Sequence, residues 1–306
     1  MATMPLPTKE ACHTVGHRSS ALMPMPAPSI PTLTAGDAKI PAIGLGTSSL
    51  GGGGETIRGE TVATALKLGY RHIDTAWKYG SERDVGEGIR ASGVPRSDIF
   101  LCTKVSHEYL RATDFARSVD ESLANLGVDY VDLLLVHWPN AEIPLKETMG
   151  ALAKARRDGL ARHIGVANFN IALLDQAIAL CPEPLVNLQG EAHPYIETTK
   201  IVDACRERGI AFTAYCPLGR GRLFSEPVLG AIAKSNGRTV AQVALRWLVQ
   251  RGNIVPIPRS SNPGRLAENL DVFSFTLSDD EMKRIDVLKR ANGRIASPAG
   301  RAPAWD

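Results

Sequence analysis

The sequence predicts an α/β fold of the (β/α)8, or TIM, barrel type, because strand-like and helix-like segments alternate from residue 42 to residue 256 and eight strands can be counted. Several apolar runs, of which residues 131–136 are the clearest, are too uniformly apolar for a sheet with one solvated face. Ionisable residues also recur at the ends of neighbouring strands, where barrels of this class carry their working residues. An N-terminal β-hairpin and extra helices before the C-terminal tail complete the expected fold.

The barrel elements follow one another in a regular order. A hairpin is expected at residues 32–41, around a turn at residues 35–37 that contains a glycine. The strands expected after it are residues 42–45, 72–74, 99–104, 131–137, 163–167, 185–191, 211–215 and 254–256. The helices expected between them are residues 60–68, 82–92, 111–126, 145–158, 171–179, 198–208 and 239–251.

The composition limits the class of protein. The chain has 306 residues, of which 44% are hydrophobic and 22% charged, as is typical of a globular protein. The formal net charge is only +3, and lysine and arginine are scattered without long basic runs, so we expect no binding to nucleic acid or to a membrane surface. No apolar run approaches the length of a membrane span, and we expect a cytoplasmic protein.

The cysteine content indicates a reducing compartment and no metal site. The chain has 5 cysteines, widely separated and without a CxxC pair, namely Cys12, Cys102, Cys181, Cys205 and Cys216. An odd number at such spacings argues against a disulfide framework and against a structural zinc site.

Residues 1–31 differ from the rest of the chain and are expected to form a disordered N-terminal extension, with the barrel domain at residues 32–306. The segment is rich in proline but lacks the continuous apolar region of a secretory signal. An alternative start at Met23 or Met25 is compatible with this pattern and leaves the barrel unchanged.

Three neighbouring strands end in ionisable residues, namely Asp74, Lys104 and His137, and Tyr79 follows in the loop after the first of these strands. Each residue has an ordinary interpretation by itself: Asp74 as a turn residue, Lys104 extending to solvent, and His137 as a buried histidine with a partner. Because the barrel brings the three strand ends to one rim, their coincidence predicts an active site.

These four side chains fit one reaction. A phenol has a pKa of about 10 and is a poor acid at neutral pH, but a nearby ammonium group favours its ionised form. We therefore expect Lys104 to lower the pKa of Tyr79, Asp74 to hold Lys104, and His137 to donate to a substrate carbonyl oxygen or to the phenol. A group reduced in this way also needs a hydride, which no side chain carries, so a nicotinamide cofactor is implied.

An anion site is predicted after the last strand. Asn262 is a suitable N-cap and Pro263 a suitable first residue for a helix, and Arg259, Ser260 and Arg265 flank that helix start. Helix N-termini bind anions, and barrels often place phosphate groups in this region. Two arginines suit the 2′-phosphate of NADP, so the sequence predicts NADPH in preference to NADH.

From Gly36 to its end, the chain resembles the aldo-keto reductases, and its short loops are similar to those of the bacterial 2,5-diketo-D-gluconate reductases. The matching stretches are IPAIGLGT (40–47), GYRHIDTAWKYGSERDVG (69–86), DYVDLLLVHWP (129–139), IGVANF (164–169), QGEAHP (189–194), AYCPLG (214–219) and PIPRS (256–260). The family's catalytic tetrad falls on Asp74, Tyr79, Lys104 and His137, the four residues selected above from the strand ends.

The resemblance also implies the residues that bind NADPH or NADP+. Thr47 matches a contact to the nicotinamide ribose, Asn168 and Gln189 match contacts to the carboxamide, and Tyr215 matches the residue that stacks on the nicotinamide ring. The remaining cofactor residues implied by the resemblance are Pro217, Leu218, Arg259, Ser260, Arg265, Glu268 and Asn269. Arg259 stands where the family has lysine, a change that keeps the charge.

The departures from the family pattern lie around the expected substrate pocket. Residues 48–54 are serine-, leucine- and glycine-rich and replace an aromatic residue, while Ala167 and Cys216 replace serines. The glycine run fits neither a dinucleotide fingerprint nor a P-loop. The residues expected at the mouth of the pocket, which would receive a small carbonyl substrate, are Ser48, Trp77, His107, Tyr109, Trp138, Arg222 and Trp305.

Two other classes of protein fit the sequence less well. A Rossmann-type dehydrogenase would need a glycine fingerprint after the first strand and an acidic residue about twenty positions later, and both are missing. A catalytically silent barrel that binds NADP as a sensor or accessory subunit is disfavoured by the complete set of four catalytic residues. The resemblance implies a monomer.

Overall fold

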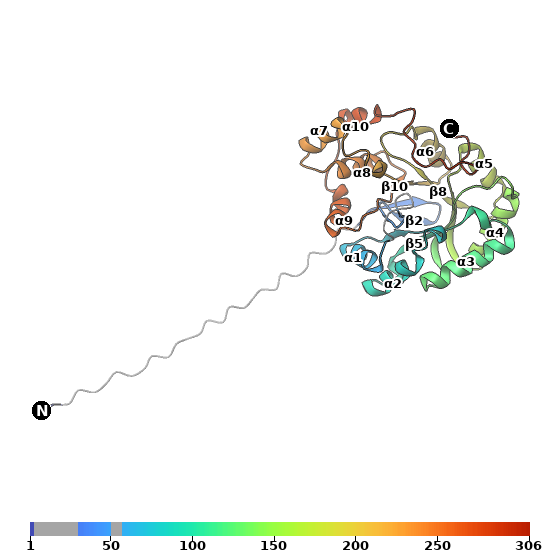
Figure 1. The fold of residues 1–306 in the computed structure, drawn as a ribbon, viewed down its shortest axis with the longest axis horizontal. Coiled ribbons are helices and arrows are strands. Elements are labelled where there is room, and N and C mark those ends of the chain that lie inside the picture. The colour runs from blue at the N-terminus through green and yellow to red at the C-terminus, as the bar shows by residue number, and fades with distance from the viewer. Residues whose placement is uncertain (3–29, 50–56) are drawn as a thin grey trace.

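The computed structural model describes residues 1–2, 30–49 and 57–306. The expected N-terminal extension therefore lies almost wholly outside the described residues, as does most of the glycine-rich stretch after Ser49. The described chain begins with an antiparallel hairpin of β1 (Thr32–Ala35) and β2 (Ala38–Pro41), as expected. A barrel of alternating strands and helices follows (Figure 1).

The barrel sheet has eight parallel strands within the described residues, and each strand pairs with its neighbour in sequence. Backbone hydrogen bonds from Gly44 N to Pro256 O (3.0 Å) and from Gly46 N to Pro258 O (3.1 Å) join the first strand to the last and close the barrel. The predicted fold is thus confirmed. The strands are β3 (Leu45–Gly46), β4 (His72–Asp74), β5 (Phe100–Val105), β6 (Val131–Val136), β7 (Ala161–Ala167), β8 (Leu185–Glu191), β9 (Ala211–Tyr215) and β10 (Ile254–Pro256).

Helices surround the sheet and bury its outer face (Figure 1). The helices are α1 (Gly59–Leu68), α2 (Glu82–Ser92), α3 (Ala112–Leu126), α4 (Leu145–Arg157), α5 (Ile171–Leu180), α6 (Thr199–Glu207), α7 (Pro227–Ser235), α8 (Val240–Gln250), α9 (Pro263–Leu270) and α10 (Asp279–Asp286). No helix in the described part of the chain is long and apolar enough to cross a membrane.

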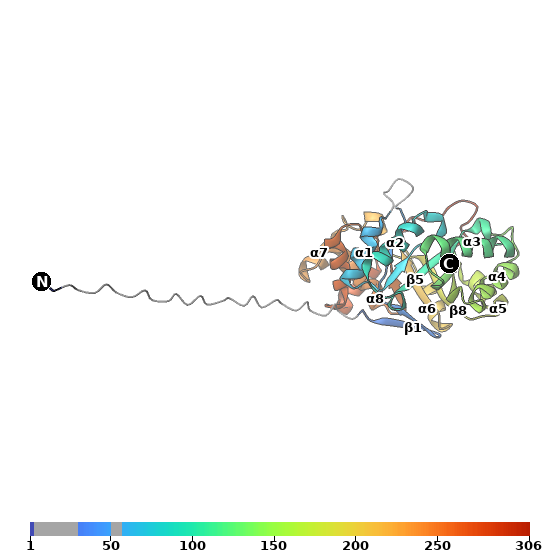
Figure 2. The ribbon, with the colours of Figure 1, turned by 90° about the horizontal axis from the view of Figure 1, so that it is seen from below.

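The β1–β2 hairpin closes the amino end of the barrel. Ala38 and Ile40 are fully buried and pack in one apolar cluster with inward-facing strand residues such as Leu133 and Val255. Figure 2 shows β1 lying across one end of the barrel. Because this end is filled with apolar side chains, ligands have access to the barrel from the opposite, carboxyl end of the strands.

The first barrel strand is shorter than predicted. Residues 42–45 were expected as a strand, but β3 covers only Leu45–Gly46. The chain bends before β3, and β3 lies where the first and last strands of the barrel meet. A Cβ atom at Gly46 would lie only 2.7 Å from the carbonyl oxygen of Ile257. The close approach of two backbones requires glycine here, and it leaves little room for a longer regular strand.

The segments that form α7 and α10 were not identified from the sequence, although extra helices were expected near the end of the chain. Both helices carry capping signals. The Glu226 side chain accepts a hydrogen bond at the start of α7, where Pro227 is the first helical residue. Ser278 and Glu281 form a complete capping box at the start of α10. These local patterns could have located both helices.

One buried histidine gives the barrel a predictable pH dependence. His72 is fully buried and its ring lies edge-on to Phe100, with 5.2 Å between the ring centroids. Burial lowers the pKa of His72 to about 4, against an opposing effect of Asp74. A histidine in an unfolded chain has a pKa of about 6.5, so the unfolded state binds a proton first as the pH falls.

We expect the free energy of unfolding to be highest above pH 6.5 and to fall between pH 6.5 and pH 4, with a contribution from His72 of about 3 kcal/mol. Urea titrations at several pH values will measure this loss. His72→Phe keeps an aromatic ring but cannot ionise, so its curve should be flatter than that of wild type in this window. Parallel curves for the two proteins would contradict the prediction.

Candidate active site

The centre of the site is a buried ion pair between β4 and β5. Lys104 Nζ lies 2.6 Å from Asp74 Oδ1, and the two side chains are 0% and 2% exposed. Asp74 is the last residue of β4 and Lys104 the last but one of β5, and these strands pair in parallel, so the sheet delivers both side chains to the same end of the barrel. Lys104 Nζ also donates to the carbonyl oxygen of Thr75, at 2.8 Å. The ammonium group is therefore held in one position.

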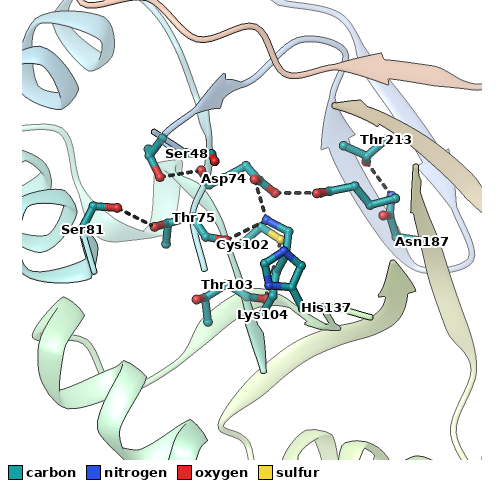
Figure 3. A network of polar contacts seen from close by, with 12 residues as sticks. Ser48, Asp74, Thr75, Ser81, Cys102, Thr103, Lys104, His137, Asn187 and Thr213 are labelled. Carbon is teal, nitrogen blue, oxygen red and sulfur yellow. Dashed lines mark hydrogen bonds and ion pairs between the residues drawn. The ribbon is translucent and has the colours of Figure 1, made fainter. Parts of the chain in front are cut away.

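Asp74 and Lys104 lie together at the centre of this network (Figure 3), and two further residues hold Asp74, one at its carboxylate and one at its backbone carbonyl oxygen. Gln189 Nε2, from β8 on the far side of the barrel, donates to Asp74 Oδ2 at 2.8 Å. Thr47 donates from its hydroxyl and from its backbone N–H to the carbonyl oxygen of Asp74, each at 3.0 Å. Both carboxylate oxygens of Asp74 thus have partners, as a buried charge requires.

Tyr79 enters the site from a single 3-10 turn, Trp77–Tyr79, that follows β4. Gly80 ends this turn with a φ of 66°, a left-handed conformation that glycine adopts without strain. Lys104 Nζ lies 5.2 Å from the centroid of the Tyr79 ring, and the His137 ring lies edge-on to it with 5.6 Å between centroids. The structure therefore brings together all four residues that the strand ends predicted.

The pKa of Tyr79 differs in direction from the prediction. Burial raises the pKa of Tyr79 above its ordinary value, and the positive charge of Lys104 opposes this rise without reversing it. The expectation of a net decrease was wrong because the cost of burying a phenolate exceeds the attraction of the ammonium group. Burial is the largest effect on Lys104 and lowers its pKa, but Asp74, Tyr79 and Cys102 together outweigh burial, and the pKa of Lys104 is raised. Tyr79 is thus a protonated donor beside a permanent cation.

His137 contributes a neutral imidazole. Burial, followed by the positive charge of Lys104, lowers the pKa of His137 well below its ordinary value. Its backbone is held by hydrogen bonds from His137 N to Val105 O, at 3.0 Å, and from Asn168 Nδ2 to His137 O, at 2.9 Å. A neutral ring keeps one N–H that can donate to an oxygen atom in the cavity.

A cavity of about 770 Å³ opens next to these residues, a size typical of sites for small molecules and cofactors. Asp74, Tyr79 and His137 line one part of it, whereas Lys104 lies behind them. Most residues predicted to bind a cofactor also line this cavity, namely Asn168, Gln189, Tyr215, Pro217, Leu218, Arg259, Ser260, Arg265, Glu268 and Asn269. Thr47 is fully buried beneath the wall, between the lining residues Gly46 and Ser48.

Asn168 has a special backbone conformation at the end of β7, with a φ of 63°. Asparagine adopts this left-handed region more readily than most residues. Its side chain joins two neighbouring strand ends, because Oδ1 accepts from the Tyr215 hydroxyl at 2.7 Å while Nδ2 donates to the carbonyl oxygen of His137. The amide still keeps one donor and one acceptor position for a ligand.

The far part of the cavity is the predicted anion site. Asn262 caps α9, because its Oδ1 atom accepts a hydrogen bond from Arg265 N at 3.1 Å. The backbone N–H of Asn262 donates to Ser260 Oγ, also at 3.1 Å. Pro263 is the first residue of the helix, as predicted. Arg259 and Arg265 both line the cavity beside this helix N-terminus. The arrangement can hold a phosphate group by charge and by backbone N–H groups.

The family model described as "Aldo/keto reductase family" matches residues 42–290 of the chain. The chain belongs to the aldo/keto reductase family. It is 42% identical over 270 residues to methylglyoxal reductase DkgB of Yersinia pestis, covering 87% of this chain and 99% of that protein. It also resembles a solved structure of a proposed 2,5-diketo-D-gluconic acid reductase B, with a TM-score of 0.86 and 42% identity over 90% of this chain and 98% of that one. Another similar structure is that of a Bombyx mori aldo-keto reductase in complex with NADP, with a TM-score of 0.79 and 34% identity over 85% of this chain and 93% of that one.

As a member of this family the protein is an oxidoreductase, and the predicted substrate residues can be compared with its cavity. Ser48 and Trp138 line the cavity. Trp77 instead packs edge-on against Tyr109, with 4.9 Å between ring centroids, and Trp305 packs against Trp138 at 6.2 Å. His107, Trp77 and Trp305 are not among the residues that line the reductase cavity.

Sequence reasoning missed several residues that line the cavity of this reductase. They are Gly46, Arg220, Gly221, Phe224, Thr239, Val240, Ala241, Ile257, Pro258, Ser261 and Ala296. Phe224 is the most informative, because it is 56% exposed although large and apolar. An exposed phenylalanine after a pair of glycines has no periodic pattern, so only its position over the cavity identifies it.

Proposed function

We propose that this protein reduces an aldehyde or a ketone to an alcohol with NADPH, and that Tyr79 donates the proton. The observation that carries the proposal is the position of Tyr79 between the Lys104 ammonium group, 5.2 Å from its ring centroid, and the neutral ring of His137. The family relationship supports the same reaction, because the matching family is described as aldo/keto reductases and a similar protein is named a methylglyoxal reductase.

The residues of the cavity fit NADPH. When bound, NADPH supplies the hydride that goes to the carbonyl carbon. Tyr215 would stack on the nicotinamide ring, and Asn168 and Gln189 would hold its carboxamide through amide positions that their internal hydrogen bonds leave open. Thr47 would lie near the nicotinamide ribose and would reach it with its hydroxyl lone pairs.

The other end of the cofactor would lie over the start of α9. Arg259, Ser260 and Arg265 surround the capped N-terminus there and would bind a 2′-phosphate, with Pro217 and Leu218 along the middle of the cavity. Glu268 and Asn269, which line the same end, would contact the adenine.

In the proposed reaction, the proton passes directly from Tyr79 to the carbonyl oxygen of the substrate. His137 donates its N–H to the carbonyl oxygen and orients it, and the Tyr79 hydroxyl transfers its proton to the same oxygen as negative charge develops there. The phenolate that remains is stabilised by Lys104, which Asp74 keeps charged and in place. The raised pKa of Tyr79 keeps the donor protonated before the reaction.

We expect wild-type protein to oxidise NADPH in the presence of a panel of aldehydes and ketones, with catalytic efficiency more than tenfold higher for NADPH than for NADH, because a charged 2′-phosphate gains charge-assisted hydrogen bonds. Arg265→Ala should lower kcat/KM for NADPH and leave that for NADH unchanged. Arg284→Ala, on the surface of α10, is the control and should change neither. Absence of reduction across the whole panel, with NADPH still bound, would sink the proposed function in favour of a binding protein.

A further inference from the structure

Two helices border the end of the cavity at which the anion site lies. Both the start of α8 and one side of α9 face this space. The residues of these helices that line the cavity are Thr239, Val240 and Ala241 at α8, and Arg265, Glu268 and Asn269 of α9. The shape of this end of the cavity therefore depends on how α8 and α9 are held against each other.

Gln242 joins these two helices. Its side chain is buried and is not among the residues that line the cavity. At one end of the side chain, Oε1 accepts from Thr239 N at 3.0 Å, which completes the capping box of α8. At the other end, Nε2 donates to the carbonyl oxygen of Glu268 in α9, at 3.1 Å. One side chain thus caps the start of α8 and holds the backbone of α9.

The two contacts of Gln242 require an amide. Thr239 N needs an acceptor and the carbonyl oxygen of Glu268 needs a donor, and a glutamine side chain supplies both. Both partners are backbone atoms, so the contacts fix the helices themselves.

Tyr70 holds α9 from another element. It is fully buried between α1 and β4, and its hydroxyl donates to the carbonyl oxygen of Leu266 in α9, at 3.1 Å. Figure 1 shows α9 between α1 and α8. Tyr70 and Gln242 therefore bind carbonyl oxygens two residues apart in the same helix, and neither side chain lines the cavity.

The position of α9 matters most for a phosphate group. The backbone N–H groups at the start of α9 and the side chain of Arg265 belong to the same helix, so they keep a fixed relation to the cavity only while the helix is held. Charge-assisted and bidentate contacts depend strongly on geometry. NADH has no 2′-phosphate and makes no such contact.

We propose that Gln242 is a positioning residue for the cofactor, which together with Tyr70 holds α9 where Arg265 and the helix N-terminus meet the 2′-phosphate of NADPH. In this way a residue outside the cavity contributes to the preference for NADPH over NADH. This inference rests on the proposed function, because it takes NADPH as the cofactor, and it adds a determinant of cofactor specificity.

The first test is Gln242→Met, which keeps the length of the side chain but cannot donate a hydrogen bond. Fluorescence titration should give a Kd for NADPH about three- to tenfold higher than in wild type, a range that matches the contribution of one internal hydrogen bond. The Kd for NADH should rise less than about twofold, since most of the loss concerns the 2′-phosphate. With saturating NADPH, kcat should stay as in wild type.

Tyr70→Phe is the second test. It removes the hydroxyl that binds Leu266 O and leaves the capping box of α8 intact. The ratio of the two Kd values should therefore shift in the same direction as in Gln242→Met. Because this variant loses only one oxygen atom, it also decides the question if Gln242→Met does not fold.

Gln250→Met is the matched control on the same helix. Gln250 Oε1 accepts from Leu277 N at 3.0 Å and its Nε2 donates to Leu277 O at 2.7 Å, at the end of α8 opposite to Gln242. Gln250 does not line the cavity. Its replacement should lower the free energy of unfolding in urea but leave the ratio of the Kd values for NADPH and NADH as in wild type.

An unchanged ratio in Gln242→Met or in Tyr70→Phe would overturn the inference, and so would an equally large change in Gln250→Met. These results would leave the proposed function intact. Wild-type protein that reduces no carbonyl compound would overturn the proposed function, whereas the titrations need no substrate and still decide the role of Gln242.

Discussion

Replacing Tyr79 with phenylalanine is expected to lower kcat by about 10²- to 10⁴-fold, because the hydroxyl is the proposed proton donor and a positioned general acid contributes that much. Phenylalanine keeps the ring, so the edge-on contact with the His137 ring at 5.6 Å and the contact with Lys104 are preserved. Binding of NADPH, measured by fluorescence titration, should therefore stay as in wild type.

Tyr109→Phe is the control for this experiment. Tyr109 packs against Trp77 and does not line the cavity, so loss of its hydroxyl should leave kcat unchanged. If Tyr79→Phe retained full turnover with several substrates, the assignment of the proton donor would be wrong. A loss of turnover together with a loss of NADPH binding would also contradict the proposed role, since it would show a defect in the cavity and not in proton transfer.

Replacing Asp74 with asparagine is expected to lower the free energy of unfolding by roughly 3 to 5 kcal/mol, because it leaves a fully buried ammonium group without its counter-charge. Lys104 is 0% exposed, and within the described part of the chain its 2.6 Å contact to Asp74 is its one ion pair. Turnover should fall in parallel, since Lys104 would no longer be held beside Tyr79. Urea titration and steady-state kinetics will measure the two effects separately.

The double variant Asp74→Asn with Lys104→Met sharpens this prediction. Removing both charges should leave the protein more stable than Asp74→Asn alone, although turnover stays low. Asp158→Asn provides a surface comparison, because its partner Lys154 is 65% exposed and such a pair contributes about 0.5 kcal/mol or less. Equal stabilities of Asp74→Asn and wild type would show that the buried pair does not have the proposed energetic role.

Much of the fold could be predicted because its elements are local patterns. The strand at residues 72–74 and the helix at residues 82–92 were predicted with the bounds that β4 and α2 have in the structure. Apolar runs and helical periodicity depend on side chains that are close in sequence, and the strands and helices that these patterns predict are present in the folded protein. The shortened first strand was missed because its length depends on the approach of Gly46 to Ile257, which is more than 200 residues away in the sequence.

The candidate site was predicted in its residues but not in its energetics. Strand ends identify Asp74, Lys104 and His137, because a parallel barrel must bring these ends to one rim. The pKa of Tyr79 was expected to fall and instead rises, because it depends on how completely the surrounding side chains exclude water. Burial is a sum over neighbours from many segments, and no local pattern in the sequence reports it.

The sequence by itself determined the class of fold and predicted the four side chains that meet at the barrel rim and the anion site before α9, since these follow from residue types at local spacings. Only the tertiary structure decided that Gln189 reaches across the barrel to Asp74 and that Tyr79 remains protonated. The physical reason is that these residues are far apart in the sequence. Charge and burial act between atoms that are neighbours in space, and the chain makes them neighbours only after it has closed the barrel.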